Sequence, residues 1–82
     1  MKEQQVLVCE TQYLSREGLK SIIGRNPFYA IAGEASSSDE LEAKLNIKSY
    51  DVVTIDITKD GPFGIDSISL IHDINPATNI IV

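Results

Sequence analysis

The 82-residue sequence lacks the features that mark nucleic-acid binders and redox proteins. It carries 7 Lys and Arg against 12 Asp and Glu, which gives a formal net charge of −5, and the basic residues form no cluster. A nucleic-acid-binding surface needs such a cluster, so any contact with DNA would require another domain. The single cysteine, Cys9, lies in an apolar run, where we expect a buried thiol in a reducing compartment.

Long apolar runs are missing as well. No stretch approaches the roughly 18 apolar residues of a membrane span, and the apolar run after residues 1–5 is too short for a signal peptide. A glycine-rich phosphate loop of the G-x-G-x-x-G or Walker type is also absent, which argues against a nucleotide-binding enzyme. We therefore expect a cytoplasmic protein without membrane contact, made of one domain or a piece of one.

Apolar runs alternate with segments of helical periodicity along the chain. Buried strands are expected at Val6–Cys9, Asp51–Asp56 and Asn79–Val82, and a weakly alternating strand is expected at Tyr29–Glu34. Helices are expected over Leu14–Arg25, Asp39–Lys48 and Gly64–Ile74. Strands that alternate with helices of about ten residues form βαβ units, with right-handed crossovers and a parallel sheet.

The spacing of apolar residues predicts which face each helix turns inward. Inward positions are expected at Leu19, Ile22 and Ile23 in the first helix, and at Ile65, Ile68, Ile74 and either Leu70 or Ile71 in the third. Arg16 and Glu17 are expected on the solvated face of the first helix. Ser37 or Ser38 can cap the second helix.

Two of the expected strands end in a carboxylate: Asp56 ends the third, and Glu10 follows the first. In open parallel sheets, ligands bind beyond the carboxyl ends of the strands. If the first and third strands are neighbours, their ends lie about 5 Å apart. Mg²⁺ suits such a site, because it takes few carboxylates and keeps waters and a phosphate oxygen, and Asp56 could then attack a phosphoryl group. The alternative is that both residues are solvated loop acids that merely end their strands.

Asn79–Val82 reads as a buried strand with nothing after it to cover or pair it. An exposed apolar edge strand invites pairing with another chain. Two explanations stay open. The chain is a truncated piece of a larger α/β domain, or the edge is satisfied in a homodimer or strand-exchanged oligomer.

Four segments cover nearly the whole chain: VLVCETQYLSREGLKSII at 6–23, GEASSSDELEAKL at 33–45, DVVTIDITKDGPFGIDSI at 51–68 and NPATNIIV at 75–82. With these segments the chain resembles the receiver domain of bacterial two-component response regulators, and in particular the subfamily that carries a C-terminal helix-turn-helix. The run LSREGL, the GEAS stretch and the unit of strand, Asp, loop and Gly are together fairly specific.

The resemblance implies a flavodoxin-like α/β fold with strand order 2-1-3-4, in which residues 1–82 form the N-terminal portion of a receiver domain without its fifth strand and last two helices. It implies a phosphoacceptor signalling domain rather than an enzyme. Asp56 would take a phosphoryl group from a sensor histidine kinase, and transcription would be controlled through a DNA-binding domain that this chain lacks. The implied Mg²⁺ ligands are Glu10, which matches the first of two metal-holding acids, Asp56 and the backbone of Thr58.

Two positions depart from the family pattern. The second acid of the pair is Thr11 here, a weak ligand at most, so Mg²⁺ binding is expected to be weak or absent in this chain. The loop after the acceptor reads Lys59-Asp60 where the family usually has Met-Pro. These departures favour a second hypothesis, a degenerate receiver that acts as an interaction or dimerisation module without phosphorylation.

Overall fold

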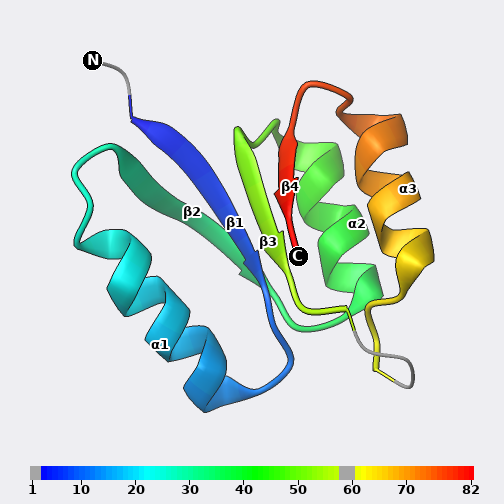
Figure 1. Ribbon diagram of the computed structural model, residues 1–82. Helices are drawn as coiled ribbons and strands as arrows, with labels where there is room; N and C mark the ends of the chain where they lie inside the picture. The colour runs from blue at the N-terminus through cyan, green and yellow to red at the C-terminus, as the bar shows by residue number, and fades with distance from the viewer. Residues whose placement is uncertain (1–2, 58–60) are drawn as a thin grey trace.

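The computed structural model describes residues 3–57 and 61–82. The elements in chain order are β1 (Gln4–Cys9), α1 (Tyr13–Gly24), β2 (Tyr29–Ala35), α2 (Ser38–Ile47), β3 (Val52–Ile55), α3 (Ile65–Ile74) and β4 (Asn79–Ile81). The strands are parallel and lie in the order β2-β1-β3-β4 (Figure 1). The flavodoxin-like fold is therefore confirmed, and each element begins and ends within two residues of its expected bounds.

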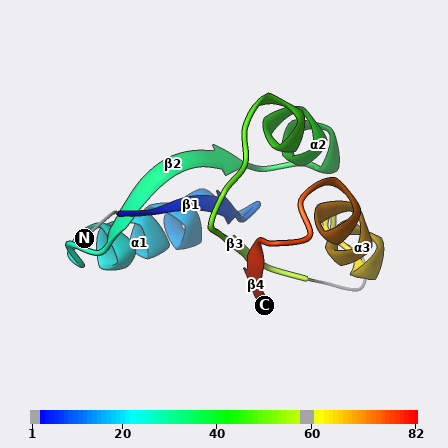
Figure 2. The same cartoon turned by 90° about the horizontal axis from the view of Figure 1, so that it is seen from above.

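Helices lie on both faces of the sheet, with α1 on one side and α2 and α3 on the other (Figure 2). The larger core, on the side of α2 and α3, consists of Leu7, Cys9, Ala35, Leu41, Leu45, Tyr50, Val53, Ile55, Phe63 and Ile71. The smaller core consists of Val6, Val8 and Val52, with Leu19, Ile23 and Ile31 packed against it. Successive side chains of a strand point to opposite faces, so residues Val6–Cys9 of β1 supply both cores in turn, which explains why this run is apolar at every position.

Serine hydroxyls organise the start of α2. Ser37 is the capping residue, because its Oγ accepts the main-chain N–H of Glu40 at 3.2 Å. The Ser36 hydroxyl donates to the Glu40 carboxylate at 2.6 Å and holds the pKa of that carboxyl below its ordinary value. The Ser38 hydroxyl donates to the main-chain carbonyl of Pro62. This last bond ties α2 to the loop that connects β3 with α3.

Three of the predicted inward positions are wrong: Ile22 is 65% exposed, Ile65 is 75% exposed, and Ile74, the last residue of α3, is 36% exposed. The inward face of α3 passes through Ser67 and Ile71, which are four residues apart. Ile65 precedes Ser67 by two residues, about 200° around the helix, and therefore faces solvent. In α1, Leu19 and Ile23 are four residues apart and pack on the smaller core. Ile22 lies at the side of this face and does not pack on that core.

Gly33 lies where β2 passes close to the core. The register of β1 against β2 shifts by one residue at this point, between the pairs Val6–Ile31 and Leu7–Gly33. A Cβ atom on Gly33 would lie 3.1 Å from the Tyr50 hydroxyl oxygen and 3.3 Å from Leu7 Cδ1. A larger residue would have to displace these neighbours, which explains why glycine occupies the position.

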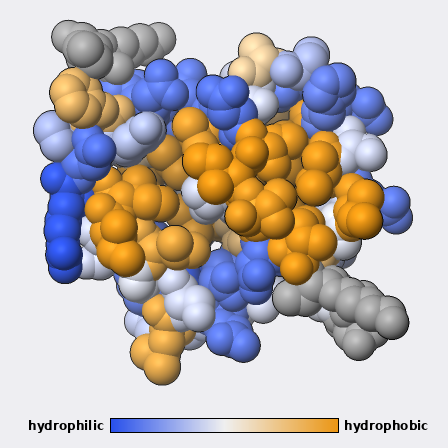
Figure 3. Space-filling view, in the orientation of Figure 1, coloured by the Kyte–Doolittle hydropathy of each residue, from blue (hydrophilic) through white to orange (hydrophobic). Residues whose placement is uncertain are grey.

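The surface over β3 and β4 is apolar on the face that α1 leaves uncovered (Figure 3). β4 lies at one edge of the described sheet, and Ile81 and Val82 are mostly exposed there. Pairing of this edge in a homodimer or strand-exchanged oligomer stays a prediction. None of the helices in the described ranges combines the length and the apolar character needed to cross a bilayer.

The thiol of Cys9 is buried in the larger core, and this burial raises its pKa from 9.0 to about 12. Because only the thiolate is nucleophilic, we expect native Cys9 to react with iodoacetamide at pH 8 more than about tenfold slower than in urea. Mass spectrometry of timed samples measures both rates, and equal rates would contradict the burial. The raised pKa also makes the free energy of unfolding depend on pH. The contribution of the buried neutral thiol is fully present below pH 9, and it is lost as the pH rises toward 12, because the unfolded chain releases the thiol proton first.

Candidate acidic site at the carboxyl ends of β1 and β3

The parallel pairing of β1 with β3 brings Glu10 and Asp56 to the same edge of the sheet. Cys9 pairs with Ile55, so the two acids are the next residue of each strand. The Asp56 main-chain N–H donates to the Cys9 carbonyl at 3.1 Å, which extends the ladder to the site. Both acids line a pocket of about 230 Å³, whose other lining residues are Cys9, Leu19, Thr54, Ile55, Ile81 and Val82. Glu10 and Asp56 are therefore neighbours at this edge of the sheet, and their role as a metal and phosphoacceptor site stays a prediction.

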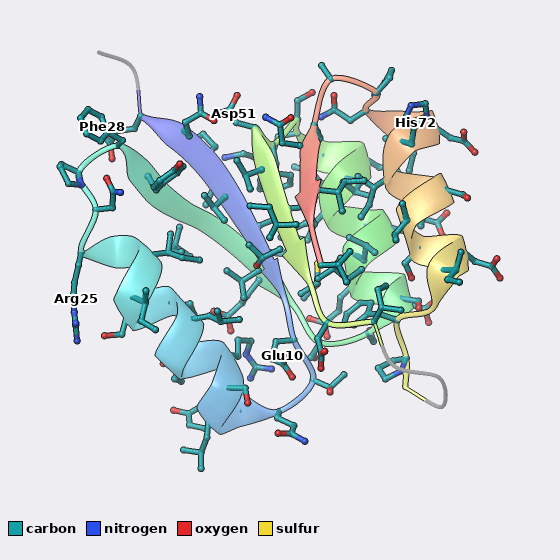
Figure 4. The ribbon with its side chains drawn as sticks, viewed as in Figure 1. Glu10, Arg25, Phe28, Asp51 and His72 are labelled. Atoms are coloured by element: carbon teal, nitrogen blue, oxygen red, sulfur yellow. The ribbon has the colours of Figure 1, made fainter. Side chains whose placement is uncertain are left out.

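Glu10 is buried, with 6% of its surface exposed, and lies beside the first turn of α1 (Figure 4). Its main-chain N–H donates to the Ala35 carbonyl at 3.1 Å. Its main-chain carbonyl accepts Arg16 Nη1 at 3.0 Å, and its Oε1 accepts the Gln12 N–H at 3.1 Å. A carboxylate has about four acceptor positions, so one amide contact leaves capacity for a cation. The residue is thus fixed in place and still able to act as a ligand.

Asp56 is exposed at the end of β3, in contrast to Glu10. Asp56 is therefore open to solvent, whereas Glu10 is not. Thr11, the weak third candidate, is exposed beside Glu10. The remaining candidate ligand, Thr58, and the Lys59-Asp60 pair lie outside the described residues.

The donor set of this pocket fits Mg²⁺ better than a metal that needs a full protein cage. Mg²⁺ is typically held by one or two carboxylates and keeps several waters, and Glu10 and Asp56 supply two. Within residues 3–57 and 61–82, no group of three or more His, Cys, Asp or Glu side chains gathers around one point. The described residues therefore offer two carboxylates at most, and the strength of Mg²⁺ binding stays a prediction.

A network of charged residues joins α1 to β2 next to the pocket. Glu34 Oε2 lies 2.6 Å from Lys20 Nζ, and Glu34 Oε1 lies 3.3 Å from Arg16 Nε. The hydrogen bond from Lys20 lowers the pKa of Glu34, and the same bond raises the pKa of Lys20. Lys20 also contacts Glu17 at 2.9 Å.

Arg16 was expected on the solvated face of the first helix, and this prediction is wrong. Its side chain is only 15% exposed and reaches back to the Glu10 carbonyl. Helical periodicity assigns charged residues to solvent by default, whereas an arginine one turn into a helix can fold back over the preceding loop. Its position six residues after the strand-ending acid is the one sequence signal that could have indicated the contact.

Comparison with known proteins bears on the fold rather than on the site. No family model matches the chain. It is 38% identical over 79 residues to the chemotaxis protein CheY of Thermotoga maritima, an alignment that covers 96% of this chain and 65% of CheY. The chain is similar to response regulators and has their receiver-domain fold. The chain thus spans about two thirds of the length of that curated relative.

Two solved response regulators superpose closely on the chain. A LuxR-family two-component response regulator from Aurantimonas sp. SI85-9A1 gives a TM-score of 0.84 at 28% identity, covering 96% of this chain and 56% of its own. The response regulator domain of Thermotoga maritima CheB gives 0.81 at 30% identity, covering 96% of this chain and 58% of its own. The LuxR-family likeness is consistent with the subfamily indicated by the sequence.

Proposed function

We propose that the chain is a phosphoacceptor module of a two-component system, in which Asp56 receives a phosphoryl group. The observation that carries this proposal is the pairing of an exposed Asp56 with a buried, fixed Glu10 in one pocket at the carboxyl ends of neighbouring strands. In this role the chain itself is modified instead of converting a separate substrate, which is the behaviour of a signalling domain rather than of a classical enzyme.

The proposed step forms an acyl phosphate. A carboxylate oxygen of Asp56 bonds to phosphorus as the phosphorus–nitrogen bond of a phosphohistidine breaks, and the electron pair of that bond stays on the imidazole. Mg²⁺, when bound, neutralises charge on the phosphoryl oxygens. Glu10, Asp56 and the Thr58 main chain are the residues that would hold it, with Thr11 contributing weakly. Glu10 is oriented for this role by its contacts to Gln12 and Arg16.

The partners follow from the same proposal. The donor is a sensor histidine kinase in the cytoplasm, and the output is control of transcription through a DNA-binding domain. This last element is supported by the likeness to a LuxR-family regulator. The acidic pocket and the net charge of −5 suit a phosphotransfer surface rather than a DNA surface.

Phosphorylation with acetyl phosphate and Mg²⁺ tests the proposal directly. We expect the intact mass of the wild-type chain to rise by one phosphoryl group, and Asp56→Asn to abolish the gain because the amide is no nucleophile. Asp51→Asn is the matched control. Asp51 is also next to β3, but it lies at the opposite end of the strand, where its carboxylate accepts the Gln5 N–H at 2.7 Å (Figure 4). Equal labelling of all three proteins would contradict the assignment of Asp56.

A degenerate receiver is the second candidate, and Thr11 favours it because the metal pocket lacks one acidic ligand of the family pattern. In that case the chain acts through protein contacts alone. Absence of labelling in the wild type, together with a concentration-dependent dimer in sedimentation, would favour this function over phosphotransfer.

A further inference from the structure

We propose that Arg16 is the positioning residue of the acidic pocket: its guanidinium fixes the Glu10 main chain and thereby the Glu10 carboxylate beside Asp56. The consequence for phosphoryl transfer rests on the function proposed above. The contact between Arg16 and Glu10 does not depend on that function, so the positioning role and the proposed function can be tested separately.

The guanidinium of Arg16 is held from three sides. Nη1 donates to the Glu10 carbonyl at 3.0 Å, and Nε lies 3.3 Å from Glu34 Oε1. The Nε contact is an ion pair without hydrogen-bond geometry, since Nε has no hydrogen-bond partner among the described residues. The guanidinium carbon also lies 5.7 Å from the centroid of the Tyr13 ring. A planar, five-donor group suits this combination, which an ammonium cannot reproduce.

Apart from the hydrogen bond from the Glu10 N–H to the Ala35 carbonyl, few hydrogen bonds hold the segment that Arg16 contacts. Gln12, at the start of α1, makes no capping hydrogen bond with its side chain, and the first turn of α1 contains no acidic residue. The turn from Glu10 to Gln12 closes through the Gln12 N–H, which donates to Glu10 Oε1. If the Arg16 side chain is removed, the part-buried Glu10 carbonyl loses the hydrogen bond from Arg16 Nη1. An unpaired buried carbonyl is unfavourable, so we expect the main chain at Glu10 to shift toward water. The carboxylate would move with it.

Lys20 provides a matched control, because it binds the same Glu34 from the same helix. Its Nζ lies 2.6 Å from Glu34 Oε2 and 2.9 Å from Glu17 Oε2, and it has no bond to Glu10. Lys20→Met removes one positive charge and weakens the join between α1 and β2, while the Arg16 bond to Glu10 remains. Loss of a nearby positive charge alone would raise the affinity for a cation, so positioning and charge predict opposite signs.

The experiment compares wild type, Arg16→Met, Arg16→Lys and Lys20→Met by amide hydrogen exchange and Mg²⁺ titration. In Arg16→Met we expect the Gln12 amide to exchange about tenfold faster relative to the Leu7 amide in the core, because one hydrogen bond of the turn depends on Glu10. The Mg²⁺ affinity is expected to fall about tenfold. Arg16→Lys is expected to show part of both effects, and Lys20→Met neither.

Equal changes of Gln12 exchange and Mg²⁺ affinity in Arg16→Met and Lys20→Met would overturn the inference. The effects would then come from the ion pairs with Glu34 and not from the hydrogen bond to Glu10. Unchanged Gln12 exchange in Arg16→Met would overturn it as well. If the wild type neither binds Mg²⁺ nor is phosphorylated, the proposed function fails, and the Gln12 exchange still decides the role of Arg16. If Arg16→Met does not fold, the same criteria apply to Arg16→Lys.

Discussion

Replacing Phe63 with alanine leaves the chain largely unfolded at 25 °C. Phe63 is 0% exposed and is the largest fully buried side chain of the described residues. Deletion of a buried phenylalanine ring costs about 3–5 kcal/mol. A domain of this length has a total stability of about 4–12 kcal/mol, and a short chain, which buries only about 60–65% of its unfolded surface, lies toward the lower end. The loss is therefore about as large as the whole free energy of unfolding, or larger.

Urea titration followed by far-ultraviolet circular dichroism measures the loss. Phe28→Ala is the matched control, because Phe28 is 50% exposed in the turn before β2 and should change the stability by less than about 0.5 kcal/mol. Similar unfolding midpoints for the two variants would contradict the packing assigned to Phe63.

The position of Phe63 also connects the core to the acidic site. Phe63 lies in the loop between β3 and α3, next to Pro62, whose carbonyl accepts the Ser38 hydroxyl of α2. The loop that follows Asp56 is thus anchored at its far end by a buried ring and a hydrogen bond. We expect any folded fraction of Phe63→Ala to be phosphorylated more slowly than wild type, because the loop bearing Thr58 loses this anchor.

The fold could be predicted from the sequence because its signals are strong and repeated. Four apolar runs separated by helical periodicity leave few alternatives to a parallel α/β sheet. The adjacency of Glu10 and Asp56 needed one further fact, that β1 and β3 are neighbours, which the spacing of apolar residues does not contain. The family resemblance supplied that order, and the pairing of Cys9 with Ile55 confirms it.

The errors concern side chains whose surroundings depend on tertiary packing. Ile22 and Ile65 satisfy the apolar pattern, but the inward lines of their helices pass through other residues, and periodicity alone does not set the rotation of a helix. Arg16 is the opposite case, a charged residue that buries its stem to reach a main-chain carbonyl. Predictions from pattern therefore fix the elements and leave the contacts around the site to the structure.

Thr11→Asp should raise the Mg²⁺ affinity of the chain about tenfold, equivalent to about 1.4 kcal/mol of binding free energy. Thr11 is exposed and adjacent to Glu10, where the family pattern places a second acid. Two unit charges about 4 Å apart attract by about 4 kcal/mol at an effective dielectric constant of about 20, and a divalent ion doubles that figure. Desolvation of the ion and screening by salt offset most of this attraction at an exposed position, so the expected gain in binding free energy is much smaller than the Coulomb energy.

Mg²⁺ titration by calorimetry at constant ionic strength measures the gain, with Thr11→Asn as the control of similar size and no charge. An equal gain in both variants would mean that shape rather than charge limits the wild-type site. Adding Asp56→Asn to Thr11→Asp should remove most of the gain, because a cation held by three carboxylates loses one of them. If the double variant keeps its affinity, the new acid binds Mg²⁺ outside the pocket that Glu10 shares with Asp56, and the phosphoacceptor proposal loses its metal site.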